Sequence, residues 1–283
     1  MINSLSETFG EWLYFKADFL KTGDRRNLEL NFINSIYEVI RIVKGVPLFI
    51  EDHYMRFRTS ADKLGISDIP SIEKIRLIIK ELCSKNVILK GNIRFELFIN
   101  QAEKIFSVYQ VPHIYPTTQQ YENGVQLVTF AIERLDPQIK QSIVNSSVRS
   151  RISELQKKSG AYEIVLVNQN NEITEGSKSN ILFISESKIY SPLKTLILEG
   201  ITRKKLIELV YRSQLEFIEK NIGIESLSQF EACILTGTSP KILPVSSING
   251  ISFNPQHVLV QKLMHIFEQH IREYCKNYIA GYF

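Results

Sequence analysis

Three short stretches in the second half of the chain combine acidic, hydroxyl and glycine residues: 172–180 (EITEGSKSN), 199–203 (EGITR) and 236–244 (TGTSPKILP). In the first, Glu175 precedes a glycine and is followed by serines and an asparagine. The other two are small turns that could offer backbone N–H groups and hydroxyls to an anion, as helix N-termini and clusters of amides do. The trio therefore predicts a carboxylate together with two anion-binding turns.

Pyridoxal phosphate needs both kinds of group from a protein. A carboxylate beside its ring nitrogen keeps that nitrogen protonated, so that the ring can draw electrons from a substrate. Backbone N–H groups, hydroxyls and usually an arginine hold its phosphate. Glu175 meets the first requirement and the two turns meet the second, so the ordered trio predicts a pyridoxal phosphate site.

Each stretch also has a simpler interpretation. An isolated acidic residue in a turn is most often only solvated, and residues 200–202 could merely begin a helix with Thr202 as its N-cap. A helix start nevertheless leaves N–H groups unpaired and points a positive dipole end at any bound phosphate. The turn 236–239 follows an apolar strand, 232–235, so a second candidate for phosphate binding lies at the end of a strand.

Composition favours an enzyme of the cytoplasm. The chain has 283 residues, of which 44% are hydrophobic, enough to bury a large core in one or two domains. The net charge of +4 is spread over both signs, which argues against nucleic acid as a partner. No apolar stretch approaches the roughly 18 residues that would cross a membrane, and the first residues do not resemble a signal peptide. Three widely spaced cysteines indicate free thiols in a reducing compartment.

The histidines do not predict a metal site. The five are His53, His113, His257, His265 and His270. None has metal-ligand spacing with a second histidine or a cysteine, so we assign them to surface or core packing. A Ser/His/Asp nucleophile motif and a glycine-rich nucleotide loop are also absent from the sequence.

The first half of the chain predicts a small domain, 1–116. Residues 35–43 and a second strand from Pro47 form a hairpin around Lys44 and Gly45, and helices follow at 51–64 and from Ser71 to about residue 86. Gly65 is well placed to end the first helix. A strand at 92–100 alternates apolar and polar residues. The polar stretch 117–124 is predicted to be a linker.

The second half predicts a larger domain, 125–283. Its expected elements are strands at 125–134 and 162–168, a helix at 148–158, a hairpin at 180–190 and a helix after residue 200. A long helix is expected to start at Asn254 and Pro255, an N-cap followed by a proline in the first turn. The chain as a whole is therefore predicted to be a pair of α+β domains with largely antiparallel sheets.

Residues 36–64 and the three stretches resemble the class IV, or fold type IV, pyridoxal phosphate enzymes, and the similarity extends over about 37–245. This family includes branched-chain and D-amino acid aminotransferases and aminodeoxychorismate lyases. The resemblance implies a two-domain α+β protomer with pyridoxal 5'-phosphate in the cleft between the domains, and a homodimer. It also implies a small amino acid and a keto acid as substrate and product.

Individual roles follow from the resemblance where motifs match. Arg56, in the H-x-x-R unit that begins at His53, would grip the phosphate, for which the planar guanidinium is well suited. Glu175 would pair with the ring nitrogen, Tyr37 would border the substrate, and Arg94 would bind a substrate carboxylate. The remaining phosphate ligands would be Ile201, Thr202, Gly237 and Thr238.

One position departs from the family pattern. In these enzymes a lysine forms a Schiff base with the cofactor and moves the proton. In D-amino acid aminotransferases and aminodeoxychorismate lyases it lies three residues before an asparagine and twenty-one before an acidic residue, which here correspond to Asn145 and Glu163. Both distances lead to Ser142, whereas Lys140 lies two residues earlier.

Two interpretations of the lysine remain open. In a strand, Lys140 and Ser142 share a face about 6.5 Å apart, so a bulge or a small insertion could bring Lys140 to the ring. Otherwise the site has no such lysine, and the chain is a non-catalytic homologue that serves as a binding or interaction protein. Spacing alone favours the loss, whereas the retained Glu175, Arg56 and phosphate turns argue against decay of the site. A third and weaker alternative is a site for another phosphorylated small molecule.

Overall fold

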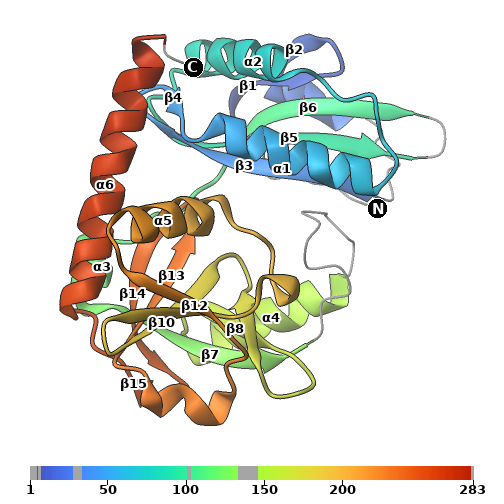
Figure 1. The fold of residues 1–283 in the computed structure, drawn as a ribbon. Coiled ribbons are helices and arrows are strands. Elements are labelled where there is room, and N and C mark those ends of the chain that lie inside the picture. The colour runs from blue at the N-terminus through green and yellow to red at the C-terminus, as the bar shows by residue number, and fades with distance from the viewer. Residues whose placement is uncertain (1–4, 6–7, 28–33, 101–102, 133–145, 282–283) are drawn as a thin grey trace. The chain divides into compact units, whose positions relative to one another are not determined.

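The computed structural model of the protein describes residues 5, 8–27, 34–100, 103–132 and 146–281. The described residues fall into two compact units (Figure 1). Unit 1 takes those of Met1–Ile114 and Ile271–Phe283, and unit 2 those of Tyr115–Gln138 and Asn145–His270.

Unit 1 contains a six-stranded antiparallel sheet in the order β2-β1-β6-β5-β3-β4. Its strands are β1 (Phe9–Phe15), β2 (Asp18–Lys21), β3 (Asn34–Val43), β4 (Val46–Pro47), β5 (Lys90–Ile99) and β6 (Lys104–Val111). Two helices, α1 (Ile50–Lys63) and α2 (Ile72–Lys85), connect β4 to β5, and a 3₁₀ helix, η2 (Thr22–Asn27), follows β2. The predicted hairpin, helices and strand of this half are confirmed.

Local signals set the ends of the two helices. The Ser71 hydroxyl accepts a hydrogen bond from the N–H of Lys74 and so caps α2. After α1 the chain turns at Gly65, whose φ of +70° is readily adopted by glycine. The N–H groups of Gly65 and Ile66 then bond back to carbonyls of the last turn, so the helix ends where the sequence predicts.

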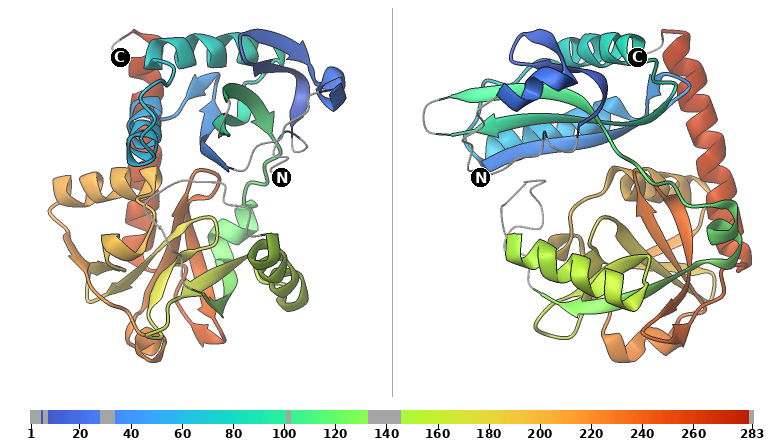
Figure 2. Two further views of the ribbon diagram at one scale, coloured as in Figure 1. Left: turned by 90° about the vertical axis from the view of Figure 1, so that its right-hand side faces the viewer. Right: turned by 180° about the vertical axis from the view of Figure 1, so that it is seen from behind.

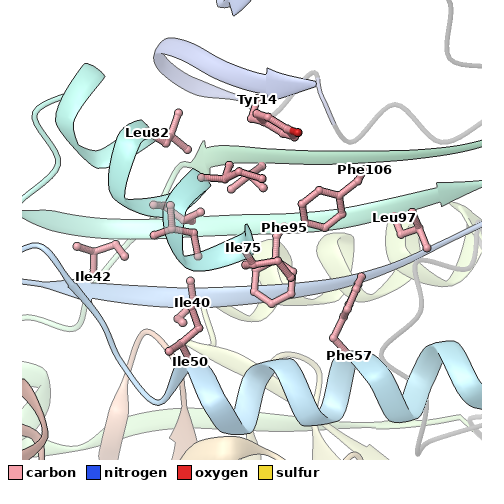
Figure 3. Close-up of a cluster of buried hydrophobic side chains, with 14 of the residues drawn as sticks. Tyr14, Ile40, Ile42, Ile50, Phe57, Ile75, Leu82, Phe95, Leu97 and Phe106 are labelled. Atoms are coloured by element: carbon pink, nitrogen blue, oxygen red, sulfur yellow. The ribbon is translucent and has the colours of Figure 1, made fainter. Parts of the chain in front are cut away.

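The main core of unit 1 lies between the sheet and the two helices. Figure 3 shows side chains of β3 and β5, such as Ile40 and Phe95, meeting Phe57 of α1 and Ile75 of α2. Because successive residues of a strand point to opposite faces, the other face of β3 carries Tyr37 instead. Tyr37, a candidate substrate residue, therefore lies on the face of the sheet away from this core.

Unit 2 contains a nine-stranded mixed sheet, with β12-β11-β10-β13-β14-β7-β8-β9 as its path and β15 paired to β14. The strands are β7 (Val125–Ala131), β8 (Glu163–Val167), β9 (Ile173–Gly176), β10 (Asn180–Ser185), β11 (Lys188–Ser191), β12 (Glu216–Glu219), β13 (Ala232–Gly237), β14 (Lys241–Ile248) and β15 (Ile251–Ser252). The Ile173 N–H bonds to the Ile222 carbonyl, so β9 returns to the chain beyond β12 and the sheet curls on itself.

The helical segments of unit 2 are α3 (Thr118–Asn123), α4 (Ser146–Ser159), α5 (Ile201–Arg212), the first part of α6 (Val258–Ile279), η3 (Lys194–Leu196) and η4 (Ile224–Gln229). One face of the curled sheet forms an apolar core that includes Cys233 and Leu235. On its other face α4 packs against β7 and β8 (Figure 2). There Ile152 and Leu155 contact a smaller cluster around Ile164. The predicted α+β class is confirmed.

Two predicted boundaries differ from the structure. The stretch 117–124, predicted as a linker, contains α3, whose N-cap Thr117 forms a capping box with Gln120, and it belongs to unit 2. The last helix begins at Val258, because the Asn254 side chain accepts from the N–H of Gln256 and so forms a local turn rather than a helix cap. From Ile271 onward the described residues of α6 belong to unit 1.

The cysteines, the lengths of the helices and the clustering of possible metal ligands can also be compared with the sequence-based expectations. All three cysteines are free, and Cys233 and Cys275 are buried. Among the described residues, none of the helices is long and apolar enough to cross a membrane. The same residues contain no group of three or more histidine, cysteine or acidic side chains that could hold a metal ion.

Candidate active site

Glu175 is a buried carboxylate near the end of β9. Only 4% of the residue is exposed, so the simpler interpretation, a solvated turn residue, is wrong. Its Oε2 accepts hydrogen bonds from the N–H of Leu198 at 3.0 Å and from the Asn180 amide at 3.4 Å. An ionised carboxylate only accepts hydrogen bonds, so these two donors suit the charged form that a protonated ring nitrogen requires.

Asn180, at the start of β10, connects Glu175 to the two turns. Its Nδ2 also donates to the Leu198 carbonyl at 2.8 Å, and the residue pairs across the sheet with Thr236 of β13. A Cβ placed on Gly200 would come within 2.0 Å of Asn180 Oδ1, so only glycine fits this approach. Asn180 is a residue of the site that the sequence did not predict. An asparagine that opens an otherwise apolar strand was the signal available.

The helix α5 starts beside Asn180 and offers its N-terminus there. Its N-cap is Gly200, which carries no side chain to bond the first turn, so the simpler interpretation with Thr202 as N-cap is wrong. Ile201 and Thr202 are instead the first two helical residues, and both are buried. Because the first N–H groups of a helix lack partners within it, this end is suited to a phosphate.

The turn after β13 lies close to the same residues. A Cβ on Gly237 would lie 3.5 Å from the Ser179 side chain, which places the turn beside the start of β10. The Tyr121 hydroxyl donates to the Pro240 carbonyl at 2.8 Å and so fixes the far end of the turn. Thr238 follows Gly237 within this turn. Five of the residues predicted to bind the cofactor belong to unit 2, and the structure brings their segments together. These residues are Glu175, Ile201, Thr202, Gly237 and Thr238.

These features fit a phosphorylated cofactor with a ring nitrogen. The carboxylate is buried and held by N–H donors, and a helix N-terminus without a side-chain cap lies against Asn180. Thr236 is 1% exposed, and its hydroxyl has no hydrogen-bond partner among the described residues. A buried polar atom without a partner is costly, so its presence here indicates a ligand that supplies one.

Glu163 supports the turn between β9 and β10. Its Oε1 accepts from the N–H of Lys178 at 2.6 Å and from the Ser179 hydroxyl at 3.0 Å. Burial is the main influence on this carboxyl and raises its pKa, while the two donors lower it only in part. A Cβ on Gly176 would lie 2.5 Å from the same oxygen, so the turn is packed tightly onto Glu163.

Glu163→Gln should become more stable relative to the unmodified protein as the pH rises. A carboxyl with a raised pKa stabilises the fold fully below its unfolded pKa, about 4.5, and this contribution is lost as the pH rises through the folded value. Glutamine keeps an acceptor for Lys178 and Ser179 but cannot ionise. Urea unfolding from pH 4 to 8 measures the difference. Glu154→Gln on the exposed side of α4 is the control, and a gap independent of pH would contradict the prediction.

In unit 1, Arg56 forms an ion pair with a buried carboxylate. Its Nε and Nη2 donate to the two oxygens of Glu38 at 2.7 and 2.6 Å, and His53 Nδ1 lies 2.7 Å from Glu38 Oε2. Glu38 is fully buried on the core face of β3, between Ile36 and Ile40. Its position in an apolar run was the sequence signal that we missed. The pairing fixes the guanidinium in place, and the phosphate role of Arg56 stays a prediction.

Tyr37 and Arg94 lie together on the opposite face of that sheet. The Arg94 guanidinium stacks on the Tyr37 ring at 3.8 Å, and its Nη2 donates to Glu96 at 2.6 Å. Glu96 also accepts from the hydroxyl of Tyr109. Burial alone would lower the pKa of Arg94, but Tyr109 and Glu96 raise it above its ordinary value, so the residue is a permanent cation. The pair suits a carboxylate, and its substrate role stays a prediction.

The residues on which the lysine question depends lie outside the described part of the chain. These are Lys140, Ser142 and Asn145. Glu163, the other reference point for the spacing, lies at the start of β8. The geometry therefore leaves the role of Lys140 as a prediction.

Comparison with known proteins identifies one family over most of the chain. The family model "Amino-transferase class IV" matches residues 35–248. A D-alanine aminotransferase from Bacillus licheniformis is 29% identical over 233 residues, which cover 77% of this chain and 80% of the relative. The sequence similarity thus includes both halves of the chain and the three stretches of the candidate site.

Solved structures show the same fold. A branched-chain amino acid aminotransferase from Escherichia coli matches with a TM-score of 0.81 at 19% identity, over 93% of this chain and 95% of its own. A chain from Legionella pneumophila assigned as a 4-amino-4-deoxychorismate lyase matches with a TM-score of 0.76 at 22% identity, over 87% of this chain and 97% of its own. The family match over most of the chain places this protein among the class IV aminotransferases, whose cofactor is pyridoxal 5'-phosphate.

Proposed function

We propose that the protein transfers the amino group of a small amino acid to a keto acid. The observation that carries this proposal is the buried carboxylate of Glu175, held by Leu198 and Asn180 beside the N-terminus of α5. This is the pairing of a ring-nitrogen partner with a phosphate site that the cofactor needs. The relative named above acts, by its name, on D-alanine, which supports a small amino acid as substrate.

The residues of unit 2 would hold the cofactor in a fixed orientation. When bound, the cofactor supplies an electron sink for the α-carbon of the amino acid. Glu175 keeps the ring nitrogen protonated, and its hydrogen bonds to Leu198 and Asn180 keep the carboxylate oriented toward that atom. The first turn of α5 and the turn at Gly237 and Thr238 bind the phosphate. These fixed N–H groups favour negative charge without having to reorganise.

The residues of unit 1 would recognise the substrate. Arg94 has a fixed positive charge and stacks on Tyr37, so the pair offers a carboxylate a cation and a hydroxyl. Glu96 and Tyr109 orient the guanidinium through hydrogen bonds. The amine of Lys140 would remove the α-proton and return it during transfer. A homodimer located in the cytoplasm is also proposed, on the basis of the resemblance and the composition.

A second candidate function has one observation in its favour. The spacing to Asn145 and Glu163 puts Ser142 where related enzymes have their lysine. A chain without that amine would bind the cofactor weakly and would not transfer amino groups, and it would serve as a binding protein. The related lyase reaction is a third outcome, since one solved neighbour is assigned to it.

Purified protein with added cofactor tests these functions. Incubation with single amino acids and 2-oxoglutarate, with keto acid and glutamate both quantified, detects transfer. D-alanine, L-alanine and the branched-chain amino acids are the first donors to compare. Release of pyruvate and an aromatic amine from amino-deoxychorismate would assign the lyase reaction. Tight cofactor binding without any product would favour the binding protein, and absence of cofactor binding would contradict the proposal.

Arg56→Ala should reduce cofactor affinity about thirtyfold, because a phosphate would lose a charge-assisted hydrogen bond worth about 2 kcal/mol. It should also lower stability, since buried Glu38 would lose its arginine partner, with His53 remaining beside it. A solvated arginine could be replaced without effect on stability, but the Arg56 side chain is only 11% exposed. Equilibrium dialysis measures the affinity.

Two further variants separate affinity from stability. Arg58→Ala on the exposed side of α1 is the matched control and should leave both unchanged. In the double variant Glu38→Gln with Arg56→Ala, the buried charge is removed, so stability should recover while affinity stays low. Recovery of affinity together with stability would remove Arg56 from the phosphate site.

A further inference from the structure

We infer that the hydroxyl of Thr236 is an additional ligand for the phosphate group held at the N-terminus of α5. The inference rests on the proposed function and adds a residue from within β13 to the set predicted from the sequence. That set took Gly237 and Thr238, at the end of β13 and just after it, and not the residue before them.

Strand geometry determines where the Thr236 side chain points. Cys233 and Leu235 face the apolar core inside the curled sheet. Residues alternate along a strand, so Ile234 and Thr236 face the other side. The helix α5 packs against β13, and none of its residues belongs to the inner core, so it lies on that other side.

Thr236 thus lies next to the start of α5. It is directly opposite Asn180 in the register of β10 and β13, and paired residues of two strands project to the same face. Asn180 in turn contacts Gly200, the N-cap of α5. The Thr236 hydroxyl therefore borders the first turn of the helix, where the N-cap Gly200 has no side chain to bond the helix N–H groups.

The hydroxyl is positioned for a ligand and not for the fold. Thr236 is 1% exposed, and its Oγ1 has no hydrogen-bond partner within the described residues. Valine has the same shape and would avoid the cost of a buried unpaired hydroxyl. The cost of this buried unpaired hydroxyl is explained if it donates to an anionic oxygen. The N-terminus of α5 beside it would bind the same anion.

The neighbouring polar groups do not satisfy this hydroxyl. The Asn180 amide donates to Glu175 and to the Leu198 carbonyl, and Ser179 donates to Glu163. The hydroxyl of a threonine rotates freely enough to donate to a phosphate oxygen, whereas the methyl group of valine offers nothing. Removal of the hydroxyl should therefore affect phosphate binding specifically.

Thr236→Val tests the inference, with Thr236→Ser as the matched control that keeps a hydroxyl. Equilibrium dialysis of each protein with pyridoxal 5'-phosphate and with pyridoxal measures the contribution of the phosphate. We expect about a tenfold or greater loss of pyridoxal phosphate affinity in the valine variant, little loss in the serine variant, and unchanged binding of pyridoxal. Without cofactor, the urea midpoint of the valine variant should equal or exceed that of the unmodified protein.

Different results would overturn different claims. Unchanged pyridoxal phosphate affinity in a folded valine variant would overturn this inference and leave the proposed function intact. An equal loss for pyridoxal and its phosphate ester would overturn the phosphate contact, as would a lower urea midpoint with unchanged affinity, which indicates a structural hydroxyl. If the unmodified protein fails to bind pyridoxal phosphate, the proposed function and this inference both fail.

Discussion

Glu175→Gln should lower turnover by about a hundredfold or more while leaving the fold intact. The glutamine is uncharged, so it cannot hold the ring nitrogen protonated, and a fixed charge at such a site is worth at least that factor. Its amide oxygen can still accept from the N–H of Leu198, where Glu175 now accepts at 3.0 Å. The local hydrogen bonding of β9 is therefore kept and the chemistry is lost.

The measurement combines kcat at saturating cofactor with the urea midpoint of the cofactor-free protein. Glu172→Gln is the matched control, because Glu172 lies just before β9 and bonds the Asn168 amide, away from Glu175. The control should retain full turnover. Equal turnover of Glu175→Gln and the unmodified enzyme would remove Glu175 from the site. A collapsed urea midpoint would instead show that the carboxylate is needed for folding.

Elements governed by local residue patterns could be predicted from the sequence. The hairpin of β10 and β11 turns at Glu186 and Ser187, both with positive φ, where the sequence has polar residues between two apolar runs. The start of α2 at Ser71 and the end of α1 at Gly65 also follow from local residue types. In each case the determining residues lie within a few positions of the element they end.

Contacts between distant strands could not be predicted in this way. Glu38 and Arg56 meet because β3 and α1 pack across a core, and Tyr37 meets Arg94 because of the register between β3 and β5. A register shift of one residue between strands would move a residue such as Tyr37 or Arg94 to the other face of the sheet. The sequence shows the residue types, whereas the pairing depends on tertiary packing.

The start of α5 shows how a distant residue overrides a local signal. Threonine and glycine are about equal as N-caps by intrinsic preference, so Thr202 was one possible start for this helix. In the structure Gly200 takes this position, because Asn180 from β10 approaches so closely that a Cβ would collide with its amide. The same approach leaves the helix without a side-chain cap, which is what a phosphate site requires.

Borohydride treatment of the protein with bound cofactor should fix the cofactor covalently on the peptide that contains Lys140. The buried Glu175 and the two segments proposed to bind phosphate indicate a retained cofactor site, and in such a site an amine would lie beside the cofactor aldehyde. Mass spectrometry of the digested protein locates the adduct. Lys140→Ala should abolish both the adduct and turnover, because the amine that forms the one and drives the other is removed.

Two variants make this result specific. Lys140→Arg keeps the positive charge but has no amine that can be deprotonated, so it should lose the adduct while binding the phosphate normally. Lys157→Ala, on the exposed side of α4, should leave the adduct and turnover unchanged. An adduct that survives in Lys140→Ala would show that another lysine performs the reaction.

The spacing to Asn145 and Glu163 makes the opposite prediction, and one variant distinguishes the two. If Ser142 truly occupies the lysine position, borohydride should yield no adduct at Lys140 in the unmodified protein. Ser142→Lys should then create one, because a partly buried amine has a lowered pKa and condenses readily with an aldehyde. A site that gains its adduct only through Ser142→Lys has kept its cofactor ligands without the amine. An adduct at Lys140 means instead that two extra residues between the lysine and Asn145 are accommodated locally, and the protein is then an ordinary enzyme of its family.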